Sequence, residues 1–202
     1  MVWITLHLVP AIFVCLGAYL LGYFTTGYYL VRFAAHRDLR QEGSGSLGAR
    51  NAGRILGTTG FVLVLIVDFC KGVLAVWLTR WFTGCEKLVL LAFLAVVVGH
   101  IWPFQLGFRG GKGVSTSLCA LLVFDSAVAL SFAEVAGLAA ILLRKFSFGG
   151  LIGFVALPWI ATAWQRDADA ILTILLIAVL VLSAHGQNVE RKFNQTKPEK
   201  EL

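Results

Sequence analysis

Two glycine-rich stretches of the sequence combine glycines with basic side chains, a composition suited to holding phosphate groups. In GSGSLGARNAGR, at 43–54, three glycines precede Arg50 and Arg54, which are spaced to share one helix face. In GFRGGKG, at 107–113, glycines surround Lys112. Glycine lets successive N–H groups turn toward an anion, and a helix that begins after the loop adds partial positive charge. The two stretches therefore predict two phosphate sites, with tight interhelical turns and membrane-surface arginine anchors as the alternative.

The second stretch does not have the pattern of a Walker nucleotide-binding loop. That loop requires a glycine five places before the Gly-Lys pair and a Ser or Thr after the lysine, and these positions hold Leu106 and Gly113. The four cysteines are scattered and include no CxxC pair, so neither a metal site nor a disulfide framework is indicated.

A third polar stretch, AHGQNVER at 184–191, places His185 and Asn188 one helical turn apart at the end of a long apolar run. The two side chains could satisfy backbone groups at that helix end. If the three polar stretches instead share one face of the membrane, they form a site built from loops on a rigid helical frame.

The composition is that of an integral membrane protein. Of the 202 residues, 58% are hydrophobic and only 14% are charged, and the mean hydropathy is +0.83. The net charge of +6 has no soluble basic domain to carry it, so anionic lipid headgroups or phosphorylated substrates match it better than nucleic acid. We expect one all-α bundle over residues 1–193 and a flexible cytoplasmic tail at 194–202.

Apolar runs at about 3–31, 55–79, 88–104, 147–164 and 169–184 predict membrane spans. Residues 113–143 form either one long helix or two helices separated near Asp125. Two helices, with seven spans in all, put 13 of the 17 lysines and arginines on the inner side and three on the outer side, whereas one helix splits them eight against eight. Because cytoplasmic loops carry the excess of basic residues, we predict seven spans, with the N-terminus outside and the C-terminus in the cytoplasm. The helix at 113–124 is too short to cross alone, so it should be tilted, partly sunk behind its neighbours, or extended by the glycine loop before it.

Several ionisable residues fall inside the predicted spans. Asp68 and Lys71 are three residues apart and are predicted to form a structural ion pair. We expect His100, at the end of the third span, to be buried and hydrogen-bonded, with a direct role in the site as the alternative. Glu134 has no partner nearby in the sequence, which makes it a minor candidate for bundle packing or protonation.

Together these residues resemble a family, the integral-membrane acyl-phosphate:glycerol-3-phosphate acyltransferases of bacteria known as the PlsY family. The family's first motif reads roughly GSGNxGATNxxR, and GSGSLGARNAGR stands in its place. The second reads roughly GHxxPxFxxFxGGKGVAT and is met by GHIWPFQLGFRGGKGVST, and the third, HxxN before a basic residue, is met by HGQNVER. An Asp-x-x-Lys-Gly at 68–72 is similar to the family's as well. The resemblance covers essentially the whole chain.

The resemblance implies an enzyme that transfers a fatty acyl group from acyl phosphate to the sn-1 hydroxyl of glycerol 3-phosphate, giving lysophosphatidic acid and phosphate. It implies no metal, no cofactor, no acyl-CoA and no required protein partner, and a site on the cytoplasmic face of a bacterial cell membrane. The family's functional residues fall on Ser44, Arg54, Lys112, His185 and Asn188. The phosphate loops would comprise Gly43, Gly45, Gly48, Arg50, Asn51, Gly110, Gly111 and Gly113, with support from Ser46, Asp68, Lys71 and His100.

The sequence departs from the family's motifs at three positions. Ser46 replaces the usual Asn, Arg50 replaces the usual Thr, and Gly186 stands where a basic residue commonly follows the histidine. An extra guanidinium should strengthen anion binding and could crowd the glycerol, so a changed acceptor or a catalytically silent member is an alternative. A small anion transporter is an alternative of another class, since helix N-termini and basic loops also suit that task.

Overall fold

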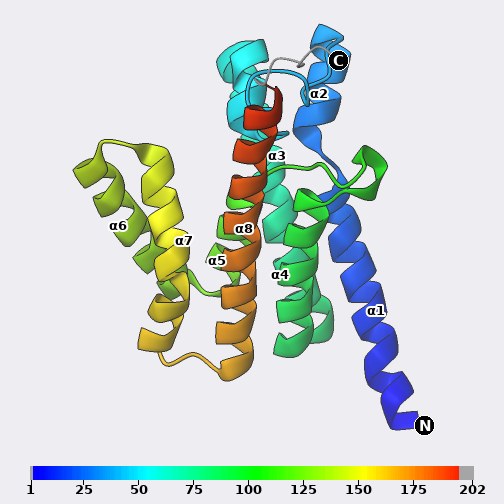
Figure 1. Ribbon diagram of the computed structural model, residues 1–202. Coiled ribbons are helices and arrows are strands. Elements are labelled where there is room, and N and C mark those ends of the chain that lie inside the picture. The colour runs from blue at the N-terminus through cyan, green and yellow to red at the C-terminus, as the bar shows by residue number, and fades with distance from the viewer. Residues whose placement is uncertain (1, 196–202) are drawn as a thin grey trace.

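The computed structural model describes residues 2–195, with side chains for residues 8–186, and every regular element in this part of the chain is a helix (Figure 1). The predicted flexible tail falls on 194–202, of which residues 196–202 lie outside the described residues. The elements are α1 (Val2–Tyr23), α2 (Thr26–Ala35), α3 (Ala49–Thr83), α4 (Glu86–Ile101), η1 (Phe104–Leu106), α5 (Val114–Phe124), α6 (Ser126–Leu143), α7 (Phe146–Ala163) and α8 (Ala168–Gln195).

Helices long and apolar enough to cross a membrane make up most of the described chain. There are six such segments, Leu8–Ala35, Ala49–Thr83, Glu86–Leu106, Ser126–Leu143, Phe146–Ala163 and Ala168–Gly186. The helix α5 is apolar but has only 11 residues. The protein is therefore an all-α membrane bundle with six candidate spans and one short apolar helix, and the seven-span arrangement with its orientation stays a prediction.

The ambiguous stretch 113–143 forms two helices, which confirms the predicted break near Asp125. Asp125 is the N-cap of α6, where its carboxylate accepts a hydrogen bond from the Val128 N–H at 3.2 Å. The same carboxylate accepts a bond at 3.0 Å from Arg166, in the turn before α8. The break is thus stabilised both by a helix cap and by an ion pair.

The first predicted span, 3–31, is two helices instead of one. The chain leaves helical geometry at Thr25, whose φ is −82° and ψ is 88°, and α2 begins at Thr26. The Phe24 carbonyl, which the break removes from the helical ladder, accepts a hydrogen bond from the Lys71 ammonium. A charged donor inside the bundle therefore compensates for the interrupted backbone bonds.

The third helix starts earlier than the predicted span and carries a break of its own. Residues 49–56 form a short helical segment that ends at Gly57, where φ is 68° and ψ is −162°. Only glycine adopts this backbone geometry without strain. The segment with Arg50 and Arg54 is thus set off from the membrane-spanning part of α3.

Close approach of helices at glycine holds much of the bundle together. Helices α1 and α4 pack against each other through Gly22 and Gly99, and α3 packs against α5 through Gly72. Small residues let backbones touch, which favours helix association within membranes. The short helix α5 has Thr116, Ala120 and other residues buried, in agreement with the expectation that it is sunk among its neighbours.

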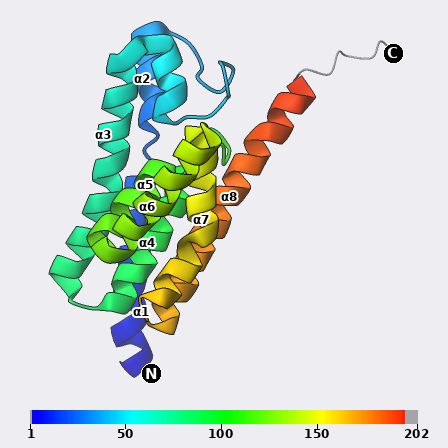
Figure 2. The same ribbon diagram turned by 90° about the vertical axis from the view of Figure 1, so that its left-hand side faces the viewer.

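The three polar stretches lie toward the same end of the bundle. In Figures 1 and 2 the first glycine loop, the second glycine loop and the C-terminal part of α8 all approach this end, as does the turn between α6 and α7. The turns that join α3 to α4 and α7 to α8 lie toward the opposite end. A site built from all three polar stretches is therefore compatible with the fold.

We predict that Gly99→Ala destabilises the bundle. A Cβ at Gly99 would lie 2.2 Å from the Tyr19 carbonyl oxygen, so α1 and α4 would have to separate, at a cost of about 1–3 kcal/mol. The matched control is Gly17→Ala in α1, where a Cβ meets nothing within 4 Å and the alanine should stabilise the helix by roughly 0.5–1 kcal/mol. Thermal unfolding of the two purified variants in detergent checks this, and equal unfolding temperatures would contradict it.

Candidate active site

The first glycine loop is organised around the buried side chain of Asn51, which is only 2% exposed. Its amide nitrogen donates to the carbonyls of Leu39 and Glu42, at 3.3 and 2.9 Å. Its amide oxygen accepts from the Ser44 N–H at 3.0 Å and from Arg54 Nη1 at 3.5 Å. One residue on the first turn of α3 therefore holds the loop at three points, residues 39, 42 and 44, and orients Arg54.

Gly43 is required where the loop passes over Asn51 and Arg54. Its φ is +54°, and a Cβ at this position would lie 2.5 Å from Asn51 Oδ1 and 3.2 Å from Arg54 Nη1. Ser44 follows it, partly exposed, beside the Arg54 guanidinium. The structure thus brings Gly43, Ser44, Asn51 and Arg54 together, as predicted.

The remaining predicted residues of this loop shape its backbone. The Gly45 N–H donates to the Glu42 carbonyl at 2.9 Å, and the Gly48 N–H is 3.4 Å from Ser46 Oγ. Ser46 is itself buried, so this departure from the family motif lies inside the loop. Gly48 is the N-cap of α3 and supplies no side-chain cap, which leaves the first N–H groups of that helix available to an anion.

The second glycine loop folds back onto the end of α4. The N–H groups of Gly110 and Gly111 donate to the carbonyls of Ile101 and His100, both at 3.0 Å. A Cβ at Gly111 would lie 2.1 Å from His100 Nε2, so only glycine fits against the histidine ring. These two glycines therefore bind the loop to α4, whereas the sequence had suggested that their N–H groups face an anion.

Lys112 and the start of α5 are the parts of this loop that stay available to an anion. Gly113 has a φ of +76° and is the N-cap of α5, again without a side-chain cap. The N–H groups of the first turn of α5 and the half-buried Lys112 ammonium thus lie next to each other in the chain.

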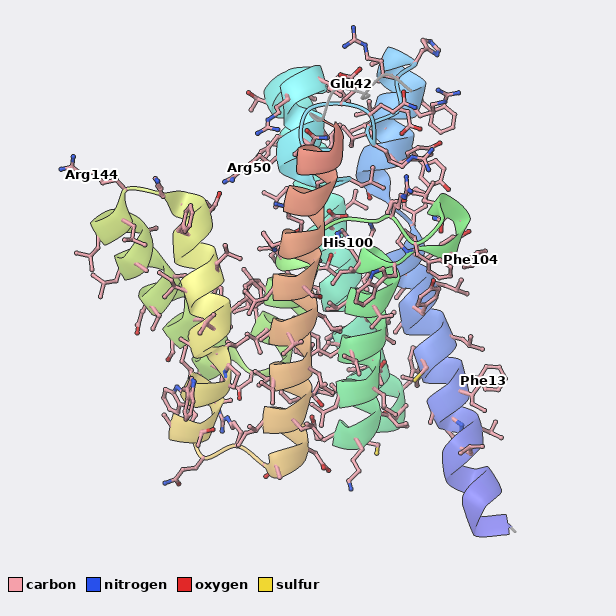
Figure 3. All side chains as sticks on the ribbon, viewed as in Figure 1. Phe13, Glu42, Arg50, His100, Phe104 and Arg144 are labelled. Atoms are coloured by element: carbon pink, nitrogen blue, oxygen red, sulfur yellow. The ribbon has the colours of Figure 1, made fainter. Side chains whose placement is uncertain are left out.

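A buried polar network supports the second loop from inside the bundle. Asp68 pairs with Lys71 at 2.8 Å, which confirms the predicted ion pair. His100 Nδ1 lies 3.8 Å from the same Asp68 oxygen and 3.2 Å from Thr116 Oγ1. His100 is 3% exposed and lies inside the bundle at the end of α4 (Figure 3). The network therefore connects α3, α4 and α5, and its histidine is the surface on which Gly111 rests.

Two positive charges at the start of α3 act on Lys112 in the second glycine loop. Burial lowers the pKa of the Lys112 ammonium, and the guanidinium groups of Arg50 and Arg54 lower that pKa further. The Lys112 charge in turn acts on the ring of His185. Both glycine loops and α8 thus contribute to one group of side chains, and their mutual repulsion favours binding of an anion.

The His185 ring is held in one tautomer. Its Nδ1 lies 2.8 Å from the Val181 carbonyl, which can only accept, so Nδ1 carries the hydrogen. In the neutral ring Nε2 is then free to accept a proton or a hydrogen bond. Asn188, its predicted partner, belongs to α8, but its side chain lies outside the described residues.

Some site contacts were not predicted from the sequence. Arg50 donates to Ser147 Oγ at 2.6 Å, a contact between residues 97 positions apart that no local pattern indicates. Thr116 joins the buried network, and only its position after the GGKG run could have pointed to it. Glu134 is exposed on α6 and forms no ion pair among the described side chains. Within residues 8–186 no group of three or more His, Cys, Asp or Glu side chains could hold a metal ion.

Fold and site together define an all-helical integral membrane protein with a cationic site at one end. Residues 12–195 match the family model described as glycerol-3-phosphate acyltransferase, and the chain belongs to this family. It is 40% identical over 185 residues to glycerol-3-phosphate acyltransferase 1 of Desulfitobacterium hafniense, covering 92% of each chain. It is 41% identical over 191 residues to the glycerol-3-phosphate acyltransferase of Synechococcus sp. (strain JA-2-3B'a(2-13)), covering 95% of each.

Two solved structures have the same fold. The crystal structure of PlsY, an integral membrane glycerol 3-phosphate acyltransferase, in its glycerol 3-phosphate form matches with a TM-score of 0.81 and 29% identity, over 93% of this chain and 94% of that one. The lysophosphatidic acid form of PlsY matches over the same shares, with a TM-score of 0.76 and 28% identity. The resemblance to the PlsY family is therefore confirmed.

We predict that Lys112 loses its proton at a lower pH than an ordinary lysine and that Arg50→Thr or Arg54→Gln raises its pKa. Removing a neighbouring positive charge removes repulsion, so the ammonium should persist to higher pH. Competitive acylation of amines across a pH series, read by peptide mass spectrometry, measures this without any activity assay. Lys87, whose side chain is 82% exposed, is the internal reference for reagent access. A Lys112 labelling curve unmoved by both substitutions would contradict the convergence of charges.

Proposed function

We propose that this protein transfers a fatty acyl group from acyl phosphate to the sn-1 hydroxyl of glycerol 3-phosphate, giving lysophosphatidic acid and inorganic phosphate. The observation that carries the proposal is the group of cationic side chains around Lys112, drawn from both glycine loops and placed beside His185. Two phosphorylated substrates require such a site. The names of the relatives and the glycerol 3-phosphate and lysophosphatidic acid forms of PlsY support the acceptor and the product.

Acyl phosphate is a mixed anhydride, so its carbonyl is already activated and phosphate is a good leaving group. The enzyme then has mainly to position two anions and to neutralise the charge that develops on the leaving phosphate. Lys112 and the first turn of α5 would do this, because a cation and a helix N-terminus adjoin there. Arg54 and Ser44, oriented by Asn51, would hold glycerol 3-phosphate.

In the chemical step the acceptor hydroxyl oxygen attacks the acyl carbonyl carbon, and the bond from that carbon to the phosphate oxygen breaks with its electron pair leaving on phosphate. The hydroxyl proton passes either to His185 Nε2, which its Nδ1 contact leaves free, or to a phosphate oxygen. His185 with Asn188 would orient the hydroxyl or polarise the carbonyl. The acyl chain would lie between apolar helices of the bundle.

We predict that the purified protein releases inorganic phosphate only when palmitoyl phosphate and glycerol 3-phosphate are both present. Lys112→Ala should reduce the rate by about 10²–10³-fold, the usual effect of removing a group that stabilises developing charge. Lys87→Ala, a change to an exposed lysine remote from the loops, should keep the wild-type rate.

The product analysis tests the finer part of the proposal. Chromatography of the lipid product should give 1-acyl lysophosphatidic acid, and palmitoyl-CoA should not replace palmitoyl phosphate as donor. Failure of a folded wild-type protein to release phosphate would reject the proposed reaction, and other alcohols would then be screened because Arg50 and Ser46 alter the first loop.

We also propose that the site faces the cytoplasm of a bacterial cell, with seven spans and the N-terminus outside. In a cysteine-free background, Ser44→Cys should react with a membrane-impermeant maleimide only in inverted vesicles. A variant whose only cysteine is Cys85, which is exposed in the turn after α3, should react with the same maleimide in intact cells. Labelling of Ser44→Cys in intact cells would reject this orientation.

A further inference from the structure

Arg50 connects the first glycine loop to a helix of the other half of the bundle. Its Nη1 donates to Ser147 Oγ at 2.6 Å, and its Cζ lies 5.7 Å from the centroid of the Phe146 ring. Both partners belong to the first turn of α7, which otherwise packs on α6 and α8. Figure 3 shows the Arg50 side chain reaching from the top of α3 toward the turn between α6 and α7, near Arg144. Arg50 therefore bridges α3 and α7 at the site's end of the bundle.

The same guanidinium belongs electrostatically to the site. Arg50 and Arg54 are four residues apart on one short helical segment, and both positive charges act on Lys112. Lys112 and His185 are close enough to interact as well. Arg50 thus bonds to a neutral hydroxyl on α7 while its charge acts on Lys112.

A phosphate is the stronger partner for Arg50. A hydrogen bond to a neutral, exposed hydroxyl contributes little net free energy, whereas guanidinium and phosphate form charge-assisted and often bidentate bonds. Three cations close together repel one another, and an arriving dianion is attracted to all three, which offsets that repulsion. The exposed position of Arg50 and Ser147 leaves the side chain free to change partners.

We infer that Arg50 is a mobile phosphate ligand, which rests on Ser147 and Phe146 when the site is empty and transfers to the phosphate beside Lys112 when that phosphate binds. Ser147 then competes with the ligand for Arg50. The inference rests on the proposed function, because it takes the phosphate of acyl phosphate, or the inorganic phosphate product, as the ligand. It assigns the added arginine of this chain a role in how tightly the donor and product bind.

If Arg50 exchanges between Ser147 and phosphate, two substitutions should change phosphate binding in opposite directions, which a fixed Arg50 would not produce. Arg50→Thr removes the ligand and should weaken phosphate binding. Ser147→Ala removes the competitor and should strengthen it. A static membrane-surface anchor would leave binding unchanged in both variants, and a structural clamp between α3 and α7 would weaken binding in both.

Calorimetric titration of the detergent-purified protein with inorganic phosphate at low ionic strength tests the inference. Relative to the wild type, the dissociation constant should rise about tenfold in Arg50→Thr and fall about two- to fivefold in Ser147→Ala. The double variant should bind like Arg50→Thr, because Ser147 acts only through Arg50. Arg50→Lys, which keeps the charge but loses the planar fork, should lie between the wild type and Arg50→Thr.

Thermal unfolding of each variant controls for folding, and Lys112→Ala provides a protein with a disrupted site. Weaker or unchanged binding in Ser147→Ala, unchanged binding in Arg50→Thr, or no phosphate binding by the wild type would each overturn the inference. The titration needs no turnover, so its outcome is separate from that of the acyl-transfer assay. If Arg50→Thr binds phosphate more weakly and Ser147→Ala binds it more tightly, but the protein transfers no acyl group, this inference stands and the proposed reaction is rejected.

Discussion

The rest of this structure depends on the bonds made by the Lys71 ammonium. It is buried within the bundle, and it bonds both to Asp68 and to the Phe24 carbonyl at the break between α1 and α2. An unpaired charge in this position would be costly, so the break, the aspartate and the lysine require one another. Through Asp68 the same charge reaches His100, and His100 supports the second glycine loop. The direction in which α2 leaves the bundle and the path of a loop at its end are thus set by one pair of opposite charges.

Hydrogen bonds to the loop backbones stabilise the candidate site, whereas repulsion between its positive charges destabilises it. Asn51 and the carbonyls of α4 form hydrogen bonds with backbone groups of the two loops. The glycines therefore serve to set the conformation of the loops. The cations are not paired with acidic residues in the same way, and burial, together with the Arg50 and Arg54 charges, lowers the pKa of Lys112. A rigid frame with unneutralised positive charge is pre-organised for anions, because little reorganisation is needed when the negative charge arrives. The arrangement therefore favours phosphate chemistry over a role in membrane anchoring.

Much of the fold was predictable from the sequence, and the exceptions share a cause. Basic residues in the loops indicated the break near Asp125, and the spacing of Asp68 and Lys71 indicated their ion pair. The break at Thr25 was not predictable, because the flanking glycines Gly22 and Gly27 lie within α1 and α2 and the donor that stabilises the break is 47 residues from Phe24. Similarly, the sequence shows that glycines surround Lys112 but cannot show that the N–H groups of Gly110 and Gly111 turn back to α4. The local sequence pattern predicts the helices and which of their ends are polar. Hydrogen-bond partners on other helices depend on packing, which no short stretch of sequence encodes.

The break at Gly57 gives α3 two axes instead of one. Bilayers of different thickness tilt the helices that cross them, and a long straight helix would carry that tilt into every side chain along it. At Gly57 the chain leaves helical geometry and turns back on itself, so that Gly53 packs against Phe61, where a Cβ at Gly53 would lie 2.8 Å from the Phe61 Cβ. The segment at 49–56 is also held to its own loop through Asn51. The tilt of the spanning part of α3 is therefore not carried to Arg54 along one continuous helix, and the position of this arginine depends on the first loop and on the turn at Gly57.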